Sequence, residues 1–402
     1  MAALFEPLTL RGITLRNRIG VSPMVQVSAT DGYASDWHLV HLGARAAGGA
    51  ALVMTEATAI EARGRISVND LGIWKDEHIE KLSRITDFIH QQGAVAGIQL
   101  GHGGRKASYA PPFNQEGMQP LRALTPEQGA WQVLGASAIP FDETSPMPKA
   151  MSREDIEQVL SAYAQAATRS DAAGFDWIEI HAAHGYLPHC FYSPLSNERS
   201  DEYGGSFENR IRFTVEIARR VRNVWPDHKV LAFRLSHTDW IEGGWTTNET
   251  VELSRRLKEE GADLIDVSSG GTSAKTVALM RQLRHDKVGK QPGLKDPVAD
   301  IPIGPGYQVP GAEAVRKGAK IPVAAVGLIT EPEQANDIIK SGKADMVMLA
   351  RAILRDPNWP QQAAIVLSAT QEVRIPVQYY LAWKDYGEFR YKPVSAPTLE
   401  HQ

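Results

Sequence analysis

The sequence has a single cysteine, Cys190, among 402 residues. One thiol excludes a disulfide within the chain, a cysteine-based structural zinc site and a cysteine-ligated iron–sulfur cluster. Any redox chemistry would therefore need an organic cofactor or a metal held by other side chains.

Long apolar runs and blocks of like charge are also missing. No stretch reaches the roughly 18 uncharged apolar residues of a membrane span, and Met1 to Pro7 lacks the basic and apolar parts of a signal peptide. Lys plus Arg number 43 against 47 Asp plus Glu, which gives a net charge of −4 and no basic cluster for nucleic acid. We expect a cytoplasmic protein that binds neither membrane nor nucleic acid.

The sequence does contain an alternation of apolar strands with helix patterns. Hydrophobic residues make up 43% and charged residues 22% of the chain, close to the average of a globular protein. Short runs rich in Val, Ile and Leu are typical of parallel strands buried on both faces. Eight such runs occur, at residues 18–24, 50–56, 94–100, 176–182, 229–236, 263–268, 321–327 and 344–351.

Helix patterns separate these strands, at residues 77–92, 152–173, 206–225, 247–260, 332–341 and 357–367. Eight alternations favour an α/β fold of the closed (β/α)8 type, the TIM barrel, over an open doubly wound sheet. The glycine fingerprint that follows the first strand of a dinucleotide-binding sheet is absent. The sequence therefore predicts one barrel domain over residues 1–370.

Three segments lie outside the alternation. Residues 106–151 and 271–310 are longer than ordinary loops, and we expect them to lie over the barrel mouth as lids or substrate walls. Residues 371–402 form an aromatic tail, which we expect to pack on the barrel or on a neighbouring subunit.

The densest group of reactive side chains follows the fourth predicted strand, where His181, His184 and Tyr186 form an H-x-x-H-G-Y array. A metal pair is one interpretation, although the H-E-x-x-H motif and a nearby third ligand are missing. Polar packing at the barrel rim is a second.

The third interpretation is catalytic. Two imidazole N–H groups directed at one substrate oxygen would stabilise the negative charge that develops there. A phenol with a pKa of about 10 stays protonated at neutral pH, so Tyr186 could protonate a carbanion. This chemistry needs a hydride donor on the opposite face of the substrate.

Four blocks of sequence resemble the old yellow enzyme family of NADH:flavin oxidoreductases. They are LFEPLTLRGITLRNRIGVSPM, IQLGHGGRKA, HAAHGYLPHCFYSPLSNERSDEYGGSFENRIRF and LARAILRDP. The resemblance spans Leu4 to about Leu367 and is strongest to the bacterial branch of xenobiotic reductase-like and thermophilic-like ene-reductases.

The resemblance implies FMN at the barrel mouth and NADPH or NADH as hydride donor. It implies reduction of an α,β-unsaturated carbonyl or nitro compound, with hydride added to the β-carbon and a proton from Tyr186 to the α-carbon. It implies no metal, and we expect a homodimer or homotetramer. The implied cofactor contacts are Pro23, Met24, Val25 and Ala57 beside the isoalloxazine, Gln99 and Arg234 at its pyrimidine side, and Val326, Gly327, Ala350 and Arg351 at the phosphate.

The sequence departs from the family at three positions. Val25 stands where relatives in this branch usually have a cysteine, Val27 where many have a tyrosine, and Leu381 where an arginine reaches a neighbouring subunit's site. Three alternatives stay open: a flavin-free barrel lyase or isomerase of a phosphorylated substrate, an FMN carrier without turnover, and a nitro compound reductase within the family.

Overall fold

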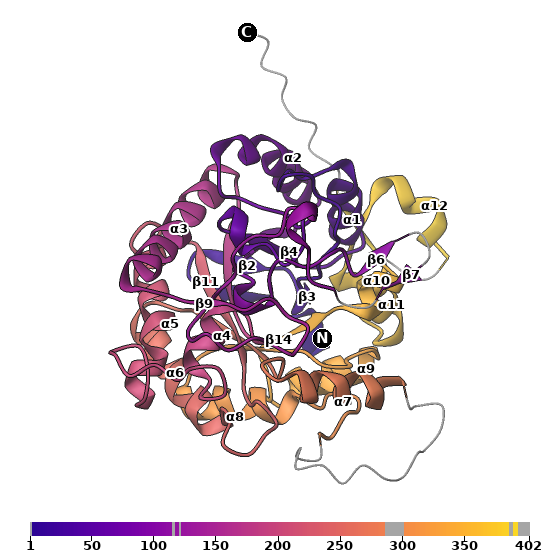
Figure 1. The fold of residues 1–402 in the computed structure, drawn as a ribbon. Coiled ribbons are helices and arrows are strands. Elements are labelled where there is room, and N and C mark those ends of the chain that lie inside the picture. Colours follow the sequence, from indigo (N-terminus) through magenta and orange to yellow (C-terminus); the bar gives the residue numbers. More distant parts are fainter. Residues whose placement is uncertain (1, 115–116, 120–121, 286–300, 386–388, 393–402) are drawn as a thin grey trace.

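The computed structural model describes residues 2–114, 117–119, 122–285, 301–385 and 389–392 (Figure 1). Eight parallel strands close into a barrel, in which β14 pairs with β3 to complete the ring. Each strand lies at one of the predicted runs, so the prediction of a TIM barrel is confirmed. The strands are β3 (Ile19–Val21), β4 (Leu52–Ala59), β5 (Val95–Gly101), β10 (Trp177–Ala182), β11 (Val230–Ser236), β12 (Leu264–Ser268), β13 (Val323–Ala325) and β14 (Met346–Leu349).

Helices form a ring around the barrel (Figure 1). The six predicted helices are present, and α1 and α8 were not predicted. The outer helices are α1 (Asp36–Ala47), α2 (Ile79–Gln91), α3 (Arg153–Ala172), α5 (Phe207–Arg222), α6 (Thr247–Glu259), α8 (Val309–Ala319), α9 (Pro332–Lys340) and α11 (Trp359–Val366).

Local sequence explains where several of these helices begin. Ser152 precedes α3, and its hydroxyl accepts the Asp155 N–H at 3.1 Å while the Asp155 carboxylate accepts the Ser152 N–H at 2.8 Å. Thr246 and Glu249 form the same reciprocal pair at α6. Each pair satisfies N–H groups that have no partner within the helix, so the helix start is fixed by two side chains.

The end of the barrel at the amino termini of its strands is closed. Met54, Trp177 and Met346 belong to an apolar cluster inside the barrel. An antiparallel hairpin of β1 (Leu8–Leu10) and β2 (Ile13–Leu15) packs against this cluster and was not predicted. Any substrate must therefore enter at the carboxyl ends of the strands.

Both predicted lids contribute side chains to the mouth, but they are not plain loops. Residues 106–151 contain β6 (Phe113–Asn114), β7 (Gly117–Met118), β8 (Leu134–Gly135) and β9 (Lys149–Ala150). The prediction of a loop over 271–310 is wrong in part, because α7 (Ala274–His285) occupies its first half. Residues 286–300 of that stretch lie outside the described residues.

The tail beyond the barrel is partly attached to it. Val373 and Ile375 are buried, and β15 (Arg374–Pro376) pairs with β16 (Arg390–Lys392). The short helix α12 (Tyr380–Trp383) carries exposed side chains, with Leu381 76% exposed. In the described part of the chain, no helix has the length and apolar character needed to cross a bilayer.

Candidate active site

A cavity of about 590 Å³ opens at the carboxyl ends of the barrel strands. This volume lies within the ordinary range for small-molecule sites. Eight of the residues that the sequence singled out line it: Pro23, His184, Tyr186, Arg234, Val326, Gly327, Ala350 and Arg351. Sequence analysis missed other lining residues, among them Ser22, Lys106, Gln308 and Arg355.

The H-x-x-H-G-Y segment ends β10 in a tight turn. His184 and Gly185 both have left-handed backbone conformations, with φ of +60° and +76°. The His184 N–H donates to the Ser236 hydroxyl at 3.0 Å, and Lys106 Nζ donates to the His184 carbonyl at 2.7 Å. The β11 strand and the first lid therefore both hold the turn in place. Lys106 lies in one of the blocks that carried the family resemblance, which was the available signal for it.

The two histidines are bonded in series. His181 Nδ1 accepts the Ala183 N–H at 3.3 Å, which assigns the His181 proton to Nε2, 3.3 Å from His184 Nδ1. His184 Nε2 lies 2.7 Å from the Ser268 hydroxyl. Two N–H groups aimed at one point were expected, but the rings bond to each other and to Ser268 instead.

Both imidazoles are neutral at neutral pH. Burial, together with the charge of Arg234 and Lys106, lowers the pKa of His181 far below its usual range. Burial and the neighbouring His181 do the same to the pKa of His184. The pair can therefore offer N–H donors to an oxygen without carrying positive charge.

Tyr186 lies beside His181, with 4.7 Å between the ring centroids. Burial, and then the nearby Asp70 carboxyl, raises the pKa of Tyr186. The phenol is therefore protonated at neutral pH and is a proton source. Tyr186 and His181 also line a second, smaller cavity together with Ala57 and Asp70.

A buried charged cluster lies beneath the main cavity. Arg234 Nε donates to the Asp266 carboxylate at 2.9 Å, and its Nη2 donates to the Ser22 hydroxyl at 2.9 Å. Glu179 lies 3.6 Å from Arg234 and accepts a hydrogen bond from Gln99 Nε2 at 2.7 Å. The structure thus brings Gln99 and Arg234 together through Glu179, which sequence analysis missed.

The cluster keeps a fixed positive charge at the cavity. Burial acts to lower the pKa of Arg234, but Asp266 and Glu179 outweigh it and raise that pKa. Burial raises the pKa of Glu179, and the neighbouring Asp266 adds to the effect. The sequence signal for Glu179 and Asp266 was an acidic residue with an apolar residue on each side inside a predicted strand.

The opposite end of the cavity carries two arginines, Arg351 and Arg355. Gly327 follows β13 with φ of +116°, and a Cβ there would lie 2.7 Å from Gln308 Nε2 and 3.0 Å from the Tyr307 ring. Glycine is therefore the residue that fits this close approach. The guanidinium groups of Arg351 and Arg355 suit a phosphate.

The remaining predicted contacts are Ala57, Met24 and Val25. Ala57 lies on β4 beside an irregularity in its pairing with β5, and it lines the smaller cavity. Met24 and Val25 are half-buried and line neither of these two cavities. The Gln26 N–H donates to Glu56 at 2.9 Å, and the Gln26 amide donates to the Met24 carbonyl at 2.8 Å.

Residues 3–369 match the NADH:flavin oxidoreductase / NADH oxidase family. The chain belongs to this family. The NADPH dehydrogenase of Geobacillus sp. (strain WCH70) is 43% identical over 95% of this chain and 98% of the relative. The NADPH dehydrogenase of Bacillus subtilis (strain 168) is 41% identical over 94% of this chain and 99% of the relative.

Solved structures agree on the fold. Morphinone reductase matches with a TM-score of 0.70 at 24% identity, over 91% of this chain and 90% of the other. A 2-naphthoyl-CoA reductase matches with a TM-score of 0.75 at 24% identity, over 92% of this chain and 53% of the other.

The protein is therefore an NAD(P)H-dependent flavin oxidoreductase of the old yellow enzyme type, as the resemblance implied. Family membership decides against the flavin-free lyase or isomerase. Among the described residues, no three His, Cys, Asp or Glu side chains are grouped to hold a metal ion, so nothing supports a metal pair at His181 and His184.

Proposed function

We propose that the protein is an FMN-dependent ene-reductase for α,β-unsaturated carbonyl compounds. The observation that carries this proposal is the segment from His181, at the end of β10, to Tyr186 in the following turn. His184 and Tyr186 line the main cavity, and His181, which is bonded to His184, lines the adjoining smaller cavity together with Tyr186. Bound FMN supplies the hydride after its reduction by NADPH or NADH.

The residues around the cavity fit FMN. Arg234 offers a fixed positive charge, which suits the pyrimidine end of a flavin, where reduction concentrates electron density. Gln99, Pro23, Met24, Val25 and Ala57 would surround the ring system. Val326, Gly327, Ala350 and Arg351 would hold the phosphate, because all four line the cavity and Arg351 supplies the charge.

The protein's own groups then control the substrate. His181 would donate its Nε2–H to the carbonyl oxygen, which would replace the bond between the two rings. His184 would donate to the same oxygen as its Nδ1–H tautomer, with its Nε2 then accepting a hydrogen bond from the Ser268 hydroxyl. As a hydride adds to the β-carbon, charge builds on the oxygen and the two donors stabilise it. Tyr186 Oη gives its proton to the α-carbon, so the alkene gains one hydride and one proton. Solvent returns a proton to Tyr186.

We also propose that the chain assembles as a homodimer or homotetramer through its tail, residues 371–402. Tyr379, Tyr380 and Leu381 are 47%, 46% and 76% exposed on adjacent positions. Clusters of exposed apolar side chains mark interaction surfaces. Light scattering on wild type and on Leu381→Asp tests this, because a monomeric wild type would contradict it.

The test of the ene-reductase activity begins with protein whose FMN content has been counted. Enones, enals and nitroalkenes are screened against NADPH and NADH, and the saturated product is identified. We expect enone reduction with one saturated product per NAD(P)H oxidised. Flavin that NADPH reduces but that no alkene reoxidises would instead support an FMN carrier, and turnover of nitro compounds alone would support a nitro reductase.

A further inference from the structure

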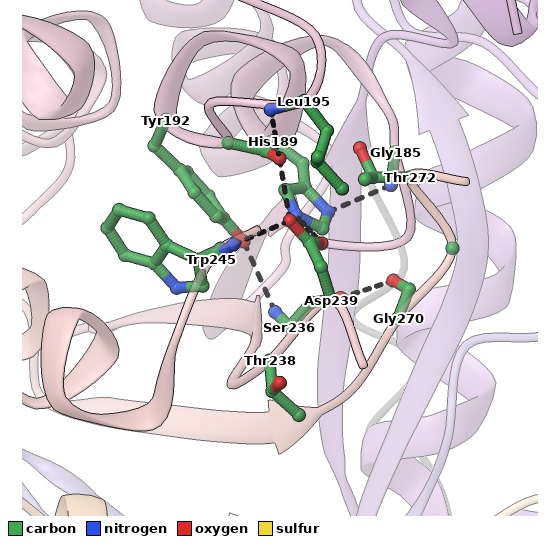
Figure 2. A network of polar contacts seen from close by, with 12 residues as sticks. Gly185, His189, Tyr192, Leu195, Ser236, Thr238, Asp239, Trp245, Gly270 and Thr272 are labelled. Atoms are coloured by element: carbon green, nitrogen blue, oxygen red, sulfur yellow. Dashed lines mark hydrogen bonds and ion pairs between the residues drawn. The ribbon is translucent and has the colours of Figure 1, made fainter. Parts of the chain in front are cut away.

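A buried histidine–aspartate pair lies behind the turn that carries His184 and Tyr186. His189 comes from α4 (Leu187–Tyr192), and Asp239 follows β11. Both side chains are fully buried, with 3.0 Å between His189 Nε2 and Asp239 Oδ1. Neither residue lines the main cavity. Figure 2 shows His189 between Gly185 and Asp239.

The backbone of the turn decides which His189 nitrogen carries the proton. The Gly185 N–H donates to His189 Nδ1 at 2.9 Å. Nδ1 must therefore be an acceptor, so the His189 proton is on Nε2. Nε2 lies on the side of the Asp239 carboxylate and contacts it at ion-pair distance, without the alignment of a hydrogen bond. The alternative tautomer would set two N–H groups against each other.

Asp239 is built to stay ionised and in place. Its Oδ2 accepts the Ser193 hydroxyl at 2.6 Å and the Trp245 N–H at 2.9 Å. Burial acts to raise the pKa of Asp239, but His189, Ser193 and Trp245 outweigh it, and the pKa is lowered. A carboxylate held this way favours the His189 tautomer that leaves Nδ1 free for Gly185.

The turn needs this support. Gly185 lies between the two groups that face the substrate, and both His184 and Gly185 adopt left-handed conformations. The Gly185 N–H is buried, and its bond to His189 fixes it from below. Tyr192 stacks on His189 with 4.5 Å between ring centroids, and its hydroxyl donates to the Ala182 carbonyl at 2.7 Å at the end of β10.

We infer that His189 and Asp239 form a positioning pair for catalysis: Asp239 fixes the His189 tautomer, His189 fixes the Gly185 N–H, and Gly185 thereby sets where the His184 ring and Tyr186 Oη meet the substrate. The inference rests on the proposed function, because it takes His184 and Tyr186 as the groups that act on the alkene. His189 and Asp239 do not touch the substrate.

The first test distinguishes the effect of the His189 Nδ1 acceptor from the effect of the ring's volume. His189→Asn keeps an oxygen acceptor near the Nδ1 position, whereas His189→Leu removes it. Asp239→Asn keeps the shape of the side chain but has only one oxygen. If that oxygen accepts the Ser193 hydroxyl and the Trp245 N–H, the amide NH₂ faces the Nε2–H of His189. We expect His189→Leu and Asp239→Asn to lower kcat for enone reduction about 10- to 100-fold, the range seen for residues that orient a catalytic group.

His189→Asn should recover most of this loss. The control is His78→Leu, since His78 is equally buried and also bonds a backbone group, the Asp31 carbonyl at 3.0 Å, away from the turn. It should lower thermal stability without the fall in kcat. A His78→Leu variant that loses as much turnover as His189→Leu would show that the effect is general destabilisation and would overturn the inference.

A double-mutant cycle tests whether His189 acts through Tyr186. With Tyr186→Phe already in place, His189→Leu should slow flavin reoxidation much less than it does in wild type. His189→Leu alone should increase the solvent isotope effect on flavin reoxidation. Adding Tyr186→Phe should abolish most of that isotope effect. Fully additive losses in the two variants would overturn the inference.

Two measurements do not depend on alkene turnover. The nitrogen chemical shifts of ¹⁵N-labelled His189 report its tautomer, and hydrogen exchange of peptide 182–190 reports the protection of the Gly185 amide. We expect protonated Nε2 in wild type and faster exchange in His189→Leu but not in His189→Asn. If wild-type protein reduces no enone, the proposed function is wrong. These two measurements would still show whether His189 accepts the Gly185 N–H with its own proton on Nε2. A protonated Nδ1 would overturn the inference alone.

Discussion

Replacing Gly185 by alanine should displace the turn that carries His184 and Tyr186 and thereby lower kcat. A Cβ at Gly185 would lie 2.9 Å from Thr272 Cα and closer still to the Gly271 carbonyl oxygen, and both are backbone atoms that cannot rotate away. The turn must move until the distance between this Cβ and Thr272 Cα has grown from 2.9 Å to at least 3.4 Å, where ordinary van der Waals contact begins. Because a displacement of about 1 Å can lower a rate by about 10²-fold, we expect kcat to fall roughly 10-fold or more.

Gly205 supplies a matched control. Its φ of +77° is nearly the +76° of Gly185, but nothing lies within 4 Å of a Cβ built there. Both alanine variants carry the left-handed strain of about 1–2 kcal/mol, and only Gly185→Ala adds the overlap, about 1–3 kcal/mol. With an unfolding entropy of about 2.1 cal/mol/K per residue, 1 kcal/mol corresponds to about 1 °C in Tm for this chain.

The assay is calorimetry on both variants together with kcat for a good enone at matched FMN content. Gly185→Ala should melt about 1–3 °C below Gly205→Ala and lose turnover, while Gly205→Ala keeps wild-type kcat. Equal Tm and equal kcat in the two variants would refute the reasoning, because they would show that the second lid yields freely at Gly271.

Three further predictions concern the chemistry. Tyr186→Phe should slow flavin reoxidation by enones about 10²-fold while leaving reduction by NAD(P)H nearly unchanged, and stopped-flow traces that slow both steps equally would contradict it. His181→Ala or His184→Ala should weaken the binding of phenols by roughly 1.5–3 kcal/mol in a spectral titration, and unchanged affinity would remove that histidine from oxygen binding. Val25→Cys should raise the flavin midpoint potential by roughly 20 mV through a new donor to the ring, checked by spectroelectrochemistry, where an unchanged or lower potential would show that the donor position is already filled.

The sequence alone predicted the barrel because each strand is a short apolar run and many helices begin at a capping residue or end at a glycine. Ser152 and Thr246 show how local the helix signal is, since each forms a reciprocal pair with a residue three positions later, and the two side chains fix the helix start. The N-terminal hairpin escaped prediction because its strands are only three residues long and half-exposed. α7 escaped because its short apolar run, from Val277 to Met280, lies within a longer stretch that is polar and rich in proline and glycine.

The candidate site also contains some features that the sequence predicts and others that it does not. His181, His184 and Tyr186 stand together in the sequence, so their shared turn was visible as a motif. The partners of these residues come from other strands: Ser268 ends β12, and Lys106 follows β5. Nothing in a single sequence states that the two histidines bond in series and end at Ser268.

The sequence by itself determined the order of strands and helices, the mouth at which the site lies and the reactive groups that stand there, because each depends on short-range periodicity, capping or motif. Only the tertiary structure decided the pairing of Arg234 with Asp266 and Glu179, and of His189 with Asp239. A pattern of burial records that a polar side chain faces inward, but its partner is fixed by barrel closure and strand register, which join residues far apart in the chain. Charge state and tautomer depend on those partners, so they too belong to the folded molecule.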